Sequence, residues 1–285
     1  MRAPEVQKTK AATRSVELIS LLQSGYGRRT DTVAVEEPLE IRLARADETG
    51  PGRAISITMR TPGHDAELAA GFLYGENIIS GRDDVAIVRS CGPSGNVLRV
   101  EVKPHVALDL ARLERNFYTS SSCGVCGKAS IDAVMSGAPV RQIPVEGRVE
   151  ASVLGGLPRQ LRAGQAVFAS TGGLHAVGLF DLSGELLAVH EDVGRHNAFD
   201  KLIGARFLAA ALPLNDSLVL LSGRASFELI QKAMMAGVPL VAAIGAPSSL
   251  AIELAEAAGM TLVAFLRENT FNVYTHPERL LGGAE

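Results

Sequence analysis

The sequence predicts an α/β protein whose N-terminal part is rich in β-strands. Three continuous apolar runs in the last third of the chain are separated by helical patterns: Leu218–Leu221, Leu240–Ile244 and Leu262–Leu266. Such runs are typical of parallel strands in a sheet that helices cover on both faces. Upstream of residue 105, apolar and polar residues alternate instead, which predicts half-buried antiparallel strands.

The composition indicates one large domain or two modest ones with a substantial core. The chain has 285 residues, 47% of them hydrophobic, and a net charge of -3. A net charge of -3 provides no overall positive charge to attract nucleic acid. No apolar stretch is long enough to predict a membrane span. Three cysteines, with no apolar signal-peptide core in the first thirty residues, lead us to expect a cytoplasmic protein.

Two regions are expected upstream of the α/β part. Residues 1–30 are polar and aperiodic apart from Val16–Leu22, so we expect a mobile arm there with at most one short element. A β-rich subdomain is expected over residues 31–118. Its predicted strands contain Leu39, Ile41 and Leu43, then Ile55, Ile57 and Met59, then Val85–Val88 and Leu98–Val102, and a helix is predicted over His64–Glu76.

The α/β domain is expected over residues 119–285, with a linker at Pro139–Glu146. Its predicted elements are a helix at Leu157–Phe168, hairpin strands at Ala176–Phe180 and Leu186–Val189, a helix after Asn197, and crossover helices at Ala225–Ala236 and Ser248–Ala258. Crossovers of this length are right-handed and place the three apolar runs as adjacent parallel strands.

Two cysteines lie two residues apart in a glycine-flanked stretch. Cys123 and Cys126 are followed by Gly127, Lys128 and a helical pattern, so the thiols are expected at the positive end of a helix dipole. A dipole and a nearby cation raise the thiolate fraction, which suits sulfur or redox chemistry. A zinc site is the alternative, although no second C-x-x-C pair supplies the usual four ligands. The third cysteine, Cys91, is expected to be a core thiol.

The loops that follow the apolar runs are rich in small polar residues. Ser222, Gly223 and Arg224 follow the first run, and Gly245–Ser249 follows the second. Ligands of open α/β sheets bind beyond the carboxyl ends of the strands, where helix N-termini favour phosphate. Arg224 and Arg267 can add bidentate contacts to phosphate. The alternative is that these residues only cap helices, and no P-loop or Rossmann fingerprint occurs in the sequence.

A cluster of acidic and imidazole side chains lies between the hairpin and the first apolar run. Glu191 and Asp192 precede His196 and Asp200, which stand one helical turn apart and are expected to hydrogen-bond. The cluster is either part of a metal site or a polar network that fixes a strand-to-helix turn. His175, which follows two glycines, is open to the same two interpretations.

Several motifs in this order resemble one family, the formate dehydrogenase accessory sulfurtransferases, or FdhD proteins. The resemblance spans residues 122–277, and the N-terminal part fits more loosely. The matching stretches are Ser122–Gly127, Gly173–His175, Glu191–Asn197 with Asp200 and Lys201, Ser222–Arg224 with Glu228, Ala246–Ser249, and Phe271–Pro277.

The resemblance implies a sulfur carrier. Family members accept persulfide sulfur from a cysteine desulfurase and pass it to the molybdenum bis(molybdopterin guanine dinucleotide) cofactor, which formate dehydrogenase needs for activity. The catalytic subunit of formate dehydrogenase is therefore an expected partner. The family's persulfide cysteine corresponds to Cys123, and Cys126 is the accessory thiol.

The resemblance also implies a cofactor site and a fold. The family's cofactor contact lies just before the Asn272–Pro277 motif. In this sequence the contact segment comprises Phe265, Leu266, Arg267, Glu268, Asn269 and Thr270. GDP is expected to bind there as a fragment of the cofactor. The family core resembles the cytidine deaminase fold, a three-layer α/β/α sandwich, and tends to form homodimers. The deaminase zinc signature is absent, because Ser122 rather than Pro precedes Cys123, so zinc and deamination are not carried over.

Two other functions remain open. The first is a binding protein that holds the molybdenum cofactor and hands it to the apo-enzyme without using the thiols. The second is a zinc or redox protein that uses Cys123 and Cys126.

Overall fold

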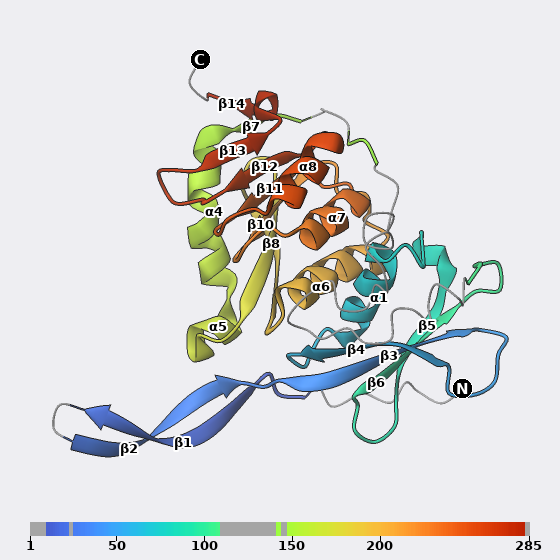
Figure 1. Ribbon diagram of the computed structural model, residues 1–285. Coiled ribbons are helices and arrows are strands. Elements are labelled where there is room, and N and C mark those ends of the chain that lie inside the picture. Colours follow the sequence, from blue (N-terminus) through green and yellow to red (C-terminus); the bar gives the residue numbers. More distant parts are fainter. Residues whose placement is uncertain (1–9, 23–24, 109–140, 144–146, 283–285) are drawn as a thin grey trace.

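A computed structural model of the chain describes residues 10–22, 25–108, 141–143 and 147–282. Its largest element is a six-stranded sheet in the order β13–β12–β11–β10–β8–β9 (Figure 1). Cys123, Cys126 and the helix expected after them lie outside the described residues, as does most of the expected linker.

The centre of the large sheet is parallel, as the apolar runs predicted. β10 (Ser217–Leu221), β11 (Leu240–Ala243) and β12 (Thr261–Ala264) are adjacent and parallel. Antiparallel strands flank them: β8 (His175–Asp181) and β9 (Leu186–Asp192) on one side, and β13 (Asn272–Thr275) on the other. The predicted hairpin is confirmed, and the complete sheet is mixed.

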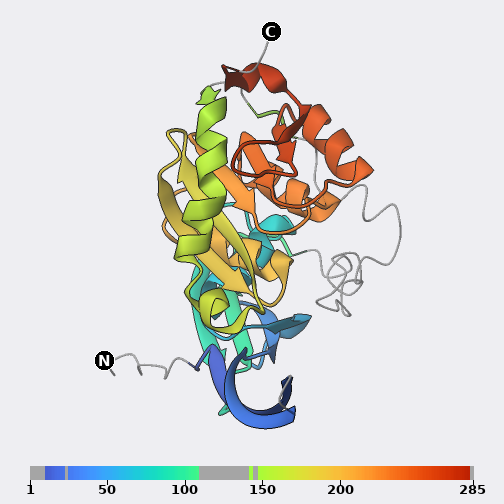
Figure 2. The ribbon, with the colours of Figure 1, turned by 90° about the vertical axis from the view of Figure 1, so that its left-hand side faces the viewer.

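Helices cover both faces of this sheet, which explains why its central strands are apolar at every position. α4 (Ala151–Gly164) lies on one face, and α6 (Arg195–Leu208), α7 (Phe227–Met235) and α8 (Ser249–Ala257) lie on the other (Figure 2). Within β10, Leu218 and Leu220 belong to the core under α4, whereas Val219 and Leu221 belong to the core under the other helices. The α/β class is confirmed, and the likeness to the cytidine deaminase fold stays a prediction.

The N-terminal sheet has the order β4–β3–β6–β5 and contains all four of the strands predicted for it. These are β3 (Glu37–Arg45), β4 (Arg53–Arg60), β5 (Val85–Cys91) and β6 (Val97–Val102). The predicted helix is α1 (Asp65–Gly75), which packs on α6. The two helix backbones touch: a Cβ atom at Gly204 would lie 1.7 Å from the carbonyl oxygen of Glu67, so a larger residue cannot fit there.

The expectation of a mobile arm with at most one short element over residues 1–30 missed a hairpin of two long strands. β1 (Thr13–Leu22) and β2 (Gly25–Ala34) form a separate two-stranded ribbon that projects from the body (Figure 1). Polar residues occupy much of both strands because both faces of the ribbon are solvated, and this weakens the apolar alternation on which strand prediction depends.

The remaining elements are short. They are α5 (Ala166–Thr171), the 3-10 turns at Arg82–Asp84 and Pro277–Arg279, and the strand pair β7 (Val149–Glu150) with β14 (Leu280–Leu281). No helix within the described ranges is long and apolar enough to cross a membrane.

Candidate functional site

The loops at the carboxyl ends of β10, β11 and β12 are bound to one another by backbone hydrogen bonds. Gly245 N donates to Gly223 O at 2.9 Å, and Phe265 N donates to Gly245 O at 3.2 Å. A Cβ atom at Gly245 would lie 2.9 Å from Gly223 O, so glycine is required for this approach. The structure therefore brings Ser222–Arg224 and Phe265–Thr270 to one edge, where the sequence predicted an anion site.

The Phe265–Thr270 segment presents a mixture of exposed and buried groups. Phe265 has a left-handed backbone with φ of 53° and an exposed side chain. Leu266 is fully buried in the core under α4, so only its backbone can reach a ligand. Arg267 N donates to Thr270 O at 2.8 Å and closes a turn in which Glu268 and Asn269 are exposed.

The two predicted phosphate-binding arginines differ in their surroundings. Arg267 Nη1 donates to the carbonyl oxygens of Ile244 and Leu266, both at 2.8 Å, which fixes the guanidinium over the loops. Arg224 is exposed and makes no hydrogen bond with the described residues. Ser222 Oγ accepts from Ala176 N at 2.8 Å, so this hydroxyl orients the loop against β8.

Helix capping accounts for part of these loops. Ser248 Oγ accepts from Ala251 N at 3.3 Å and caps α8, whereas Ser226 precedes α7 without such a bond. The capping alternative is thus confirmed for Ser248. The first N–H groups of α7 and α8 still face the same edge, and free N–H groups at a helix N-terminus favour anions.

A cavity of about 510 Å³ adjoins this edge, which sequence analysis did not predict. Its lining residues include Arg162, Gln165, Phe168, His175, Ser222 and Ile244. The guanidinium of Arg162 lies 3.9 Å from the centroid of the Phe168 ring. Gln165 is 5% exposed, and its side-chain amide makes no hydrogen bond within the described part of the chain. The cavity thus offers an aromatic face and an unused amide to a ligand.

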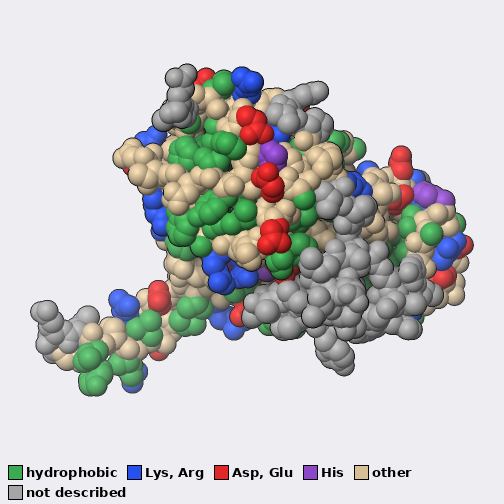
Figure 3. Space-filling view, turned by 45° about the horizontal axis from the view of Figure 1, so that its top comes forward, with side chains coloured by type: hydrophobic (Ala, Val, Ile, Leu, Met, Phe, Trp, Pro, Cys, Tyr) green, Lys and Arg blue, Asp and Glu red, His purple; other side chains and the backbone are tan. Residues whose placement is uncertain are grey.

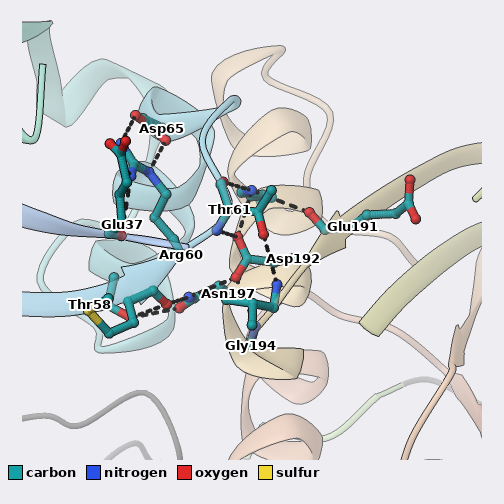
Figure 4. A network of polar contacts seen from close by, with 12 residues as sticks. Glu37, Thr58, Arg60, Thr61, Asp65, Glu191, Asp192, Gly194 and Asn197 are labelled. Carbon is teal, nitrogen blue, oxygen red and sulfur yellow. Dashed lines mark hydrogen bonds and ion pairs between the residues drawn. The ribbon is translucent and has the colours of Figure 1, made fainter. Parts of the chain in front are cut away.

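The carboxylates of Glu191 and Asp192 have structural roles, because both accept hydrogen bonds from backbone N–H groups. The Glu191 carboxylate accepts from Val167 N at 2.9 Å and Phe168 N at 2.8 Å, which holds α5 at the rim of the cavity. Asp192 is fully buried between the N-terminal sheet and the start of α6 (Figure 4). The interpretation of this motif as a polar network that fixes a strand-to-helix turn is confirmed.

Asp192 makes contacts on both sides of that junction. Its carboxylate accepts from Thr61 N at 3.1 Å, Gly194 N at 2.9 Å and Asn197 Nδ2 at 3.1 Å, and it pairs with Lys201 Nζ at 2.7 Å. Lys201 also donates to Thr61 O at 2.8 Å. The donors come from both halves of the chain, so this network binds the N-terminal sheet to the start of α6.

The predicted hydrogen bond between His196 and Asp200 is wrong. Asp200 pairs with Lys232 of α7 at 2.5 Å, and burial raises the pKa of the Asp200 carboxyl. His196 instead lies with Nε2 3.4 Å from Ser226 Oγ and 3.9 Å from the Glu228 carboxylate. His196 and Asp200 are four residues apart, a spacing that allows contact along one helix face. Residues at the start of α7 and within it contact both side chains instead.

The surroundings favour the neutral form of His175 and the charged form of Glu228, and both pKa values are lowered. Burial lowers the pKa of His175, and the charge of Arg195 lowers it further, so this imidazole is largely neutral at pH 7. The contact with His196 holds the pKa of Glu228 at about 2, assisted by its own backbone N–H and by Ser226. His175 lines the cavity, where a neutral imidazole can donate or accept one hydrogen bond.

No group of three or more His, Cys, Asp or Glu side chains suited to a metal ion occurs among the residues that the structure describes. Cys91 lies half-buried near the end of β5 in the N-terminal sheet.

We expect the Glu228→Gln variant to be less sensitive to acid than the parent protein. Because the folded-state pKa is lowered, Glu228 stabilises the fold above its unfolded-state pKa of about 4.3, and this stabilisation is lost as pH falls toward 2. The difference should be about 2–3 kcal/mol, measured as the change in unfolding free energy between pH 6 and pH 2.5. An equal loss in both proteins would contradict the assignment.

Comparison of the sequence and the fold with known proteins points to one family. The FdhD/NarQ family model matches residues 34–281. A "Sulfur carrier protein FdhD" of Mycolicibacterium paratuberculosis is 51% identical over 88% of this chain and 93% of its own length. The protein of the same name from Streptomyces coelicolor is 48% identical over 94% of this chain and 95% of its own length.

A crystal structure shares the fold as well. It is described as a formate dehydrogenase accessory protein from Desulfotalea psychrophila, and the match has a TM-score of 0.71 at 27% identity. The match covers 95% of this chain and 100% of that one. The family resemblance noted in the sequence is confirmed: the chain belongs to the FdhD/NarQ family.

Proposed function

We propose that this chain is a cytoplasmic sulfur carrier with sulfurtransferase activity. It accepts persulfide sulfur from a cysteine desulfurase on Cys123 and transfers it to the molybdenum bis(molybdopterin guanine dinucleotide) cofactor for the catalytic subunit of formate dehydrogenase. The chain acts as a homodimer. The observation that carries this proposal is the edge formed by the loops after β10, β11 and β12, together with the cavity beside it.

The strand-end edge suits the phosphates of a dinucleotide. Two helix N-termini face it, and Arg224 has no competing partner among the described residues. Arg267 is held over the loops by two carbonyl oxygens and keeps its other N–H groups for a ligand. Together these groups offer the charge-assisted hydrogen bonds that pyrophosphate favours.

The neighbouring cavity suits a flat heterocycle. Phe168 supplies an aromatic face, and the amide of Gln165 and the imidazole of His175 supply donors and acceptors for ring nitrogens and carbonyls. Its volume of about 510 Å³ lies within the range of small-molecule sites. A guanine dinucleotide carries both kinds of group, phosphate and flat ring, and so matches the edge and the cavity together.

The loading step is thiol–persulfide exchange. The Cys123 thiolate attacks the outer sulfur of the desulfurase persulfide, a new S–S bond forms to Cys123, and the desulfurase cysteine leaves as a thiolate. The outer sulfur atom moves from the desulfurase cysteine to Cys123 with no net oxidation or reduction. The expected helix dipole and Lys128 favour the attacking thiolate.

The first test is sulfur loading measured by intact mass. Incubation with a cysteine desulfurase and cysteine should add one sulfur atom to the parent protein, and reductant should remove it. Cys123→Ala should not be loaded, because the attacking thiolate is missing. Cys91→Ala is the matched control and should be loaded like the parent, since Cys91 lies in the N-terminal sheet.

Two outcomes of this test decide against the proposal. Equal loading of Cys123→Ala would mean that another group accepts the sulfur. Loss of both cysteines of the pair without loss of formate dehydrogenase activation would favour a cofactor-holding protein whose thiols are dispensable.

The second test is GDP binding measured by calorimetry. Arg224→Ala and Arg267→Ala should each weaken binding, because each removes a charge-assisted contact worth about 1.5–3 kcal/mol, or about ten- to a hundredfold. Arg89→Ala is the control, since Arg89 pairs with Glu101 in the N-terminal sheet. Sulfur loading should survive in all three variants. Unchanged affinity in both site variants would place the nucleotide elsewhere.

A further inference from the structure

The side chain of Gln165 is buried at the wall of the cavity beside α5, and it has no role in holding the fold. It is 5% exposed, and its amide makes no hydrogen bond with the described residues. An amide that is buried without a partner destabilises a fold, and each such group in a native structure calls for an explanation. Because this amide lines a cavity, a ligand there is its natural partner.

The local structure explains why this amide is unused. Gln165 stands between α4 and α5 and takes the N-cap position of α5. An N-cap side chain ordinarily accepts from the N–H of the second or third residue of its helix. In α5 these residues are Val167 and Phe168, and both donate to the carboxylate of Glu191, at 2.9 and 2.8 Å. Glu191 therefore caps α5 and leaves the amide of Gln165 to the cavity.

The other unused polar groups of the cavity are mostly donors. Arg162 has donors only, and its guanidinium makes no hydrogen bond or ion pair with the described residues. Ser222 Oγ accepts from Ala176 N, which leaves its O–H free to donate. None of the described residues that line the cavity is Asp or Glu. Such a lining favours a ring that carries a carbonyl oxygen over one that carries an amino group in its place.

We propose that Gln165 and Arg162 select guanine over adenine by recognising its lactam edge, the adjacent N1–H and C6=O groups. Guanine N1–H donates to Gln165 Oε1, and Gln165 Nε2 donates to the guanine O6. Arg162, whose guanidinium lies 3.9 Å from the centroid of the Phe168 ring, donates to O6 or N7. Adenine has an amino group at C6, so there the donors of Arg162 would meet another donor.

The cavity is continuous with the edge proposed for the phosphates. Ser222 and Ile244 line the cavity, and both also belong to the strand ends that form the edge. Arg267 Nη1 donates to Ile244 O at 2.8 Å, which fixes this guanidinium where the cavity and the edge meet. This arrangement suits one nucleotide that has its base in the cavity and its phosphates at the edge.

The arm formed by β1 and β2 does not fill the cavity. Only its base approaches the cavity wall, where β2 contacts α5. The exposed apolar side chains of the arm gather at its outer end, away from the body (Figure 3). None of Ile19, Leu21 and Tyr26 lines the cavity. These side chains therefore do not compete with a base for the aromatic face and the amide.

This assignment rests on the proposed function for its ligand, a guanine nucleotide. It concerns base selectivity, whereas sulfur loading of Cys123 is measured without any nucleotide. If GDP binds but Gln165 does not affect selectivity, the assignment fails alone. If GDP does not bind at all, the cofactor site of the proposed function fails with it.

The test is calorimetry on the full chain with GDP, IDP and ADP. The parent protein should bind GDP about ten- to a hundredfold more tightly than ADP. IDP keeps the lactam edge and lacks the 2-amino group, so its affinity should be close to that of GDP. Gln165→Leu should weaken GDP binding by about tenfold or more and leave ADP binding unchanged, because only the lactam contacts are lost.

Unfolding temperature separates a ligand contact from a structural role. Gln165→Leu should unfold at the same temperature as the parent or higher, because it removes an unpartnered buried amide. Gln160→Leu is the matched control on α4. Gln160 Nε2 donates to Gly184 O at 2.7 Å, so this variant should unfold at a lower temperature and keep the parent's preference for GDP.

Four results would each overturn the assignment. These are a parent protein that binds ADP as tightly as GDP, an IDP affinity as low as that of ADP, a Gln165→Leu variant that keeps the preference for GDP, and a lower unfolding temperature in that variant.

Discussion

The buried pair of Asp192 and Lys201 is the contact on which the arrangement of this molecule depends. The two side chains are 0% and 2% exposed, so neither charge is compensated by water. A buried charge without a partner is strongly destabilising, and here each charge is also hydrogen-bonded to Thr61 of the N-terminal part. The two contacts with Thr61 form only when the N-terminal part is docked on the start of α6.

The position of this pair connects the fold to the candidate site. Asp192 ends β9 and also binds Gly194 N, which sets the direction in which α6 begins. α6 then carries His196 toward Ser226 and Glu228 at the start of α7. The preceding residue, Glu191, holds α5 at the cavity. Two adjacent carboxylates thus orient both walls of the edge where we propose that the cofactor binds.

Sequence alone predicted the elements whose signal is local. The apolar runs from Leu218, Leu240 and Leu262 predicted three adjacent parallel strands, because a doubly covered strand must be apolar throughout. The arm was missed because a doubly exposed ribbon has the opposite composition. The partners of Asp200 and the cavity beside Phe168 were missed because they depend on packing between α6, α7, α4 and α5, which leaves no periodic signal.

The unfolding free energy of Lys201→Met tests most directly whether this one contact holds the site and the N-terminal sheet together. We expect a loss of about 3–5 kcal/mol, because the variant leaves Asp192 charged and buried. Much of the loss should be recovered in the double variant Asp192→Asn/Lys201→Met, which removes the charge and keeps an oxygen to accept from Thr61 N and Gly194 N. Lys103→Met, which removes an exposed pair with Asp83, should cost at most about 1 kcal/mol. A loss in Lys201→Met no larger than that of Lys103→Met would show that this pair does not hold the two parts of the molecule together.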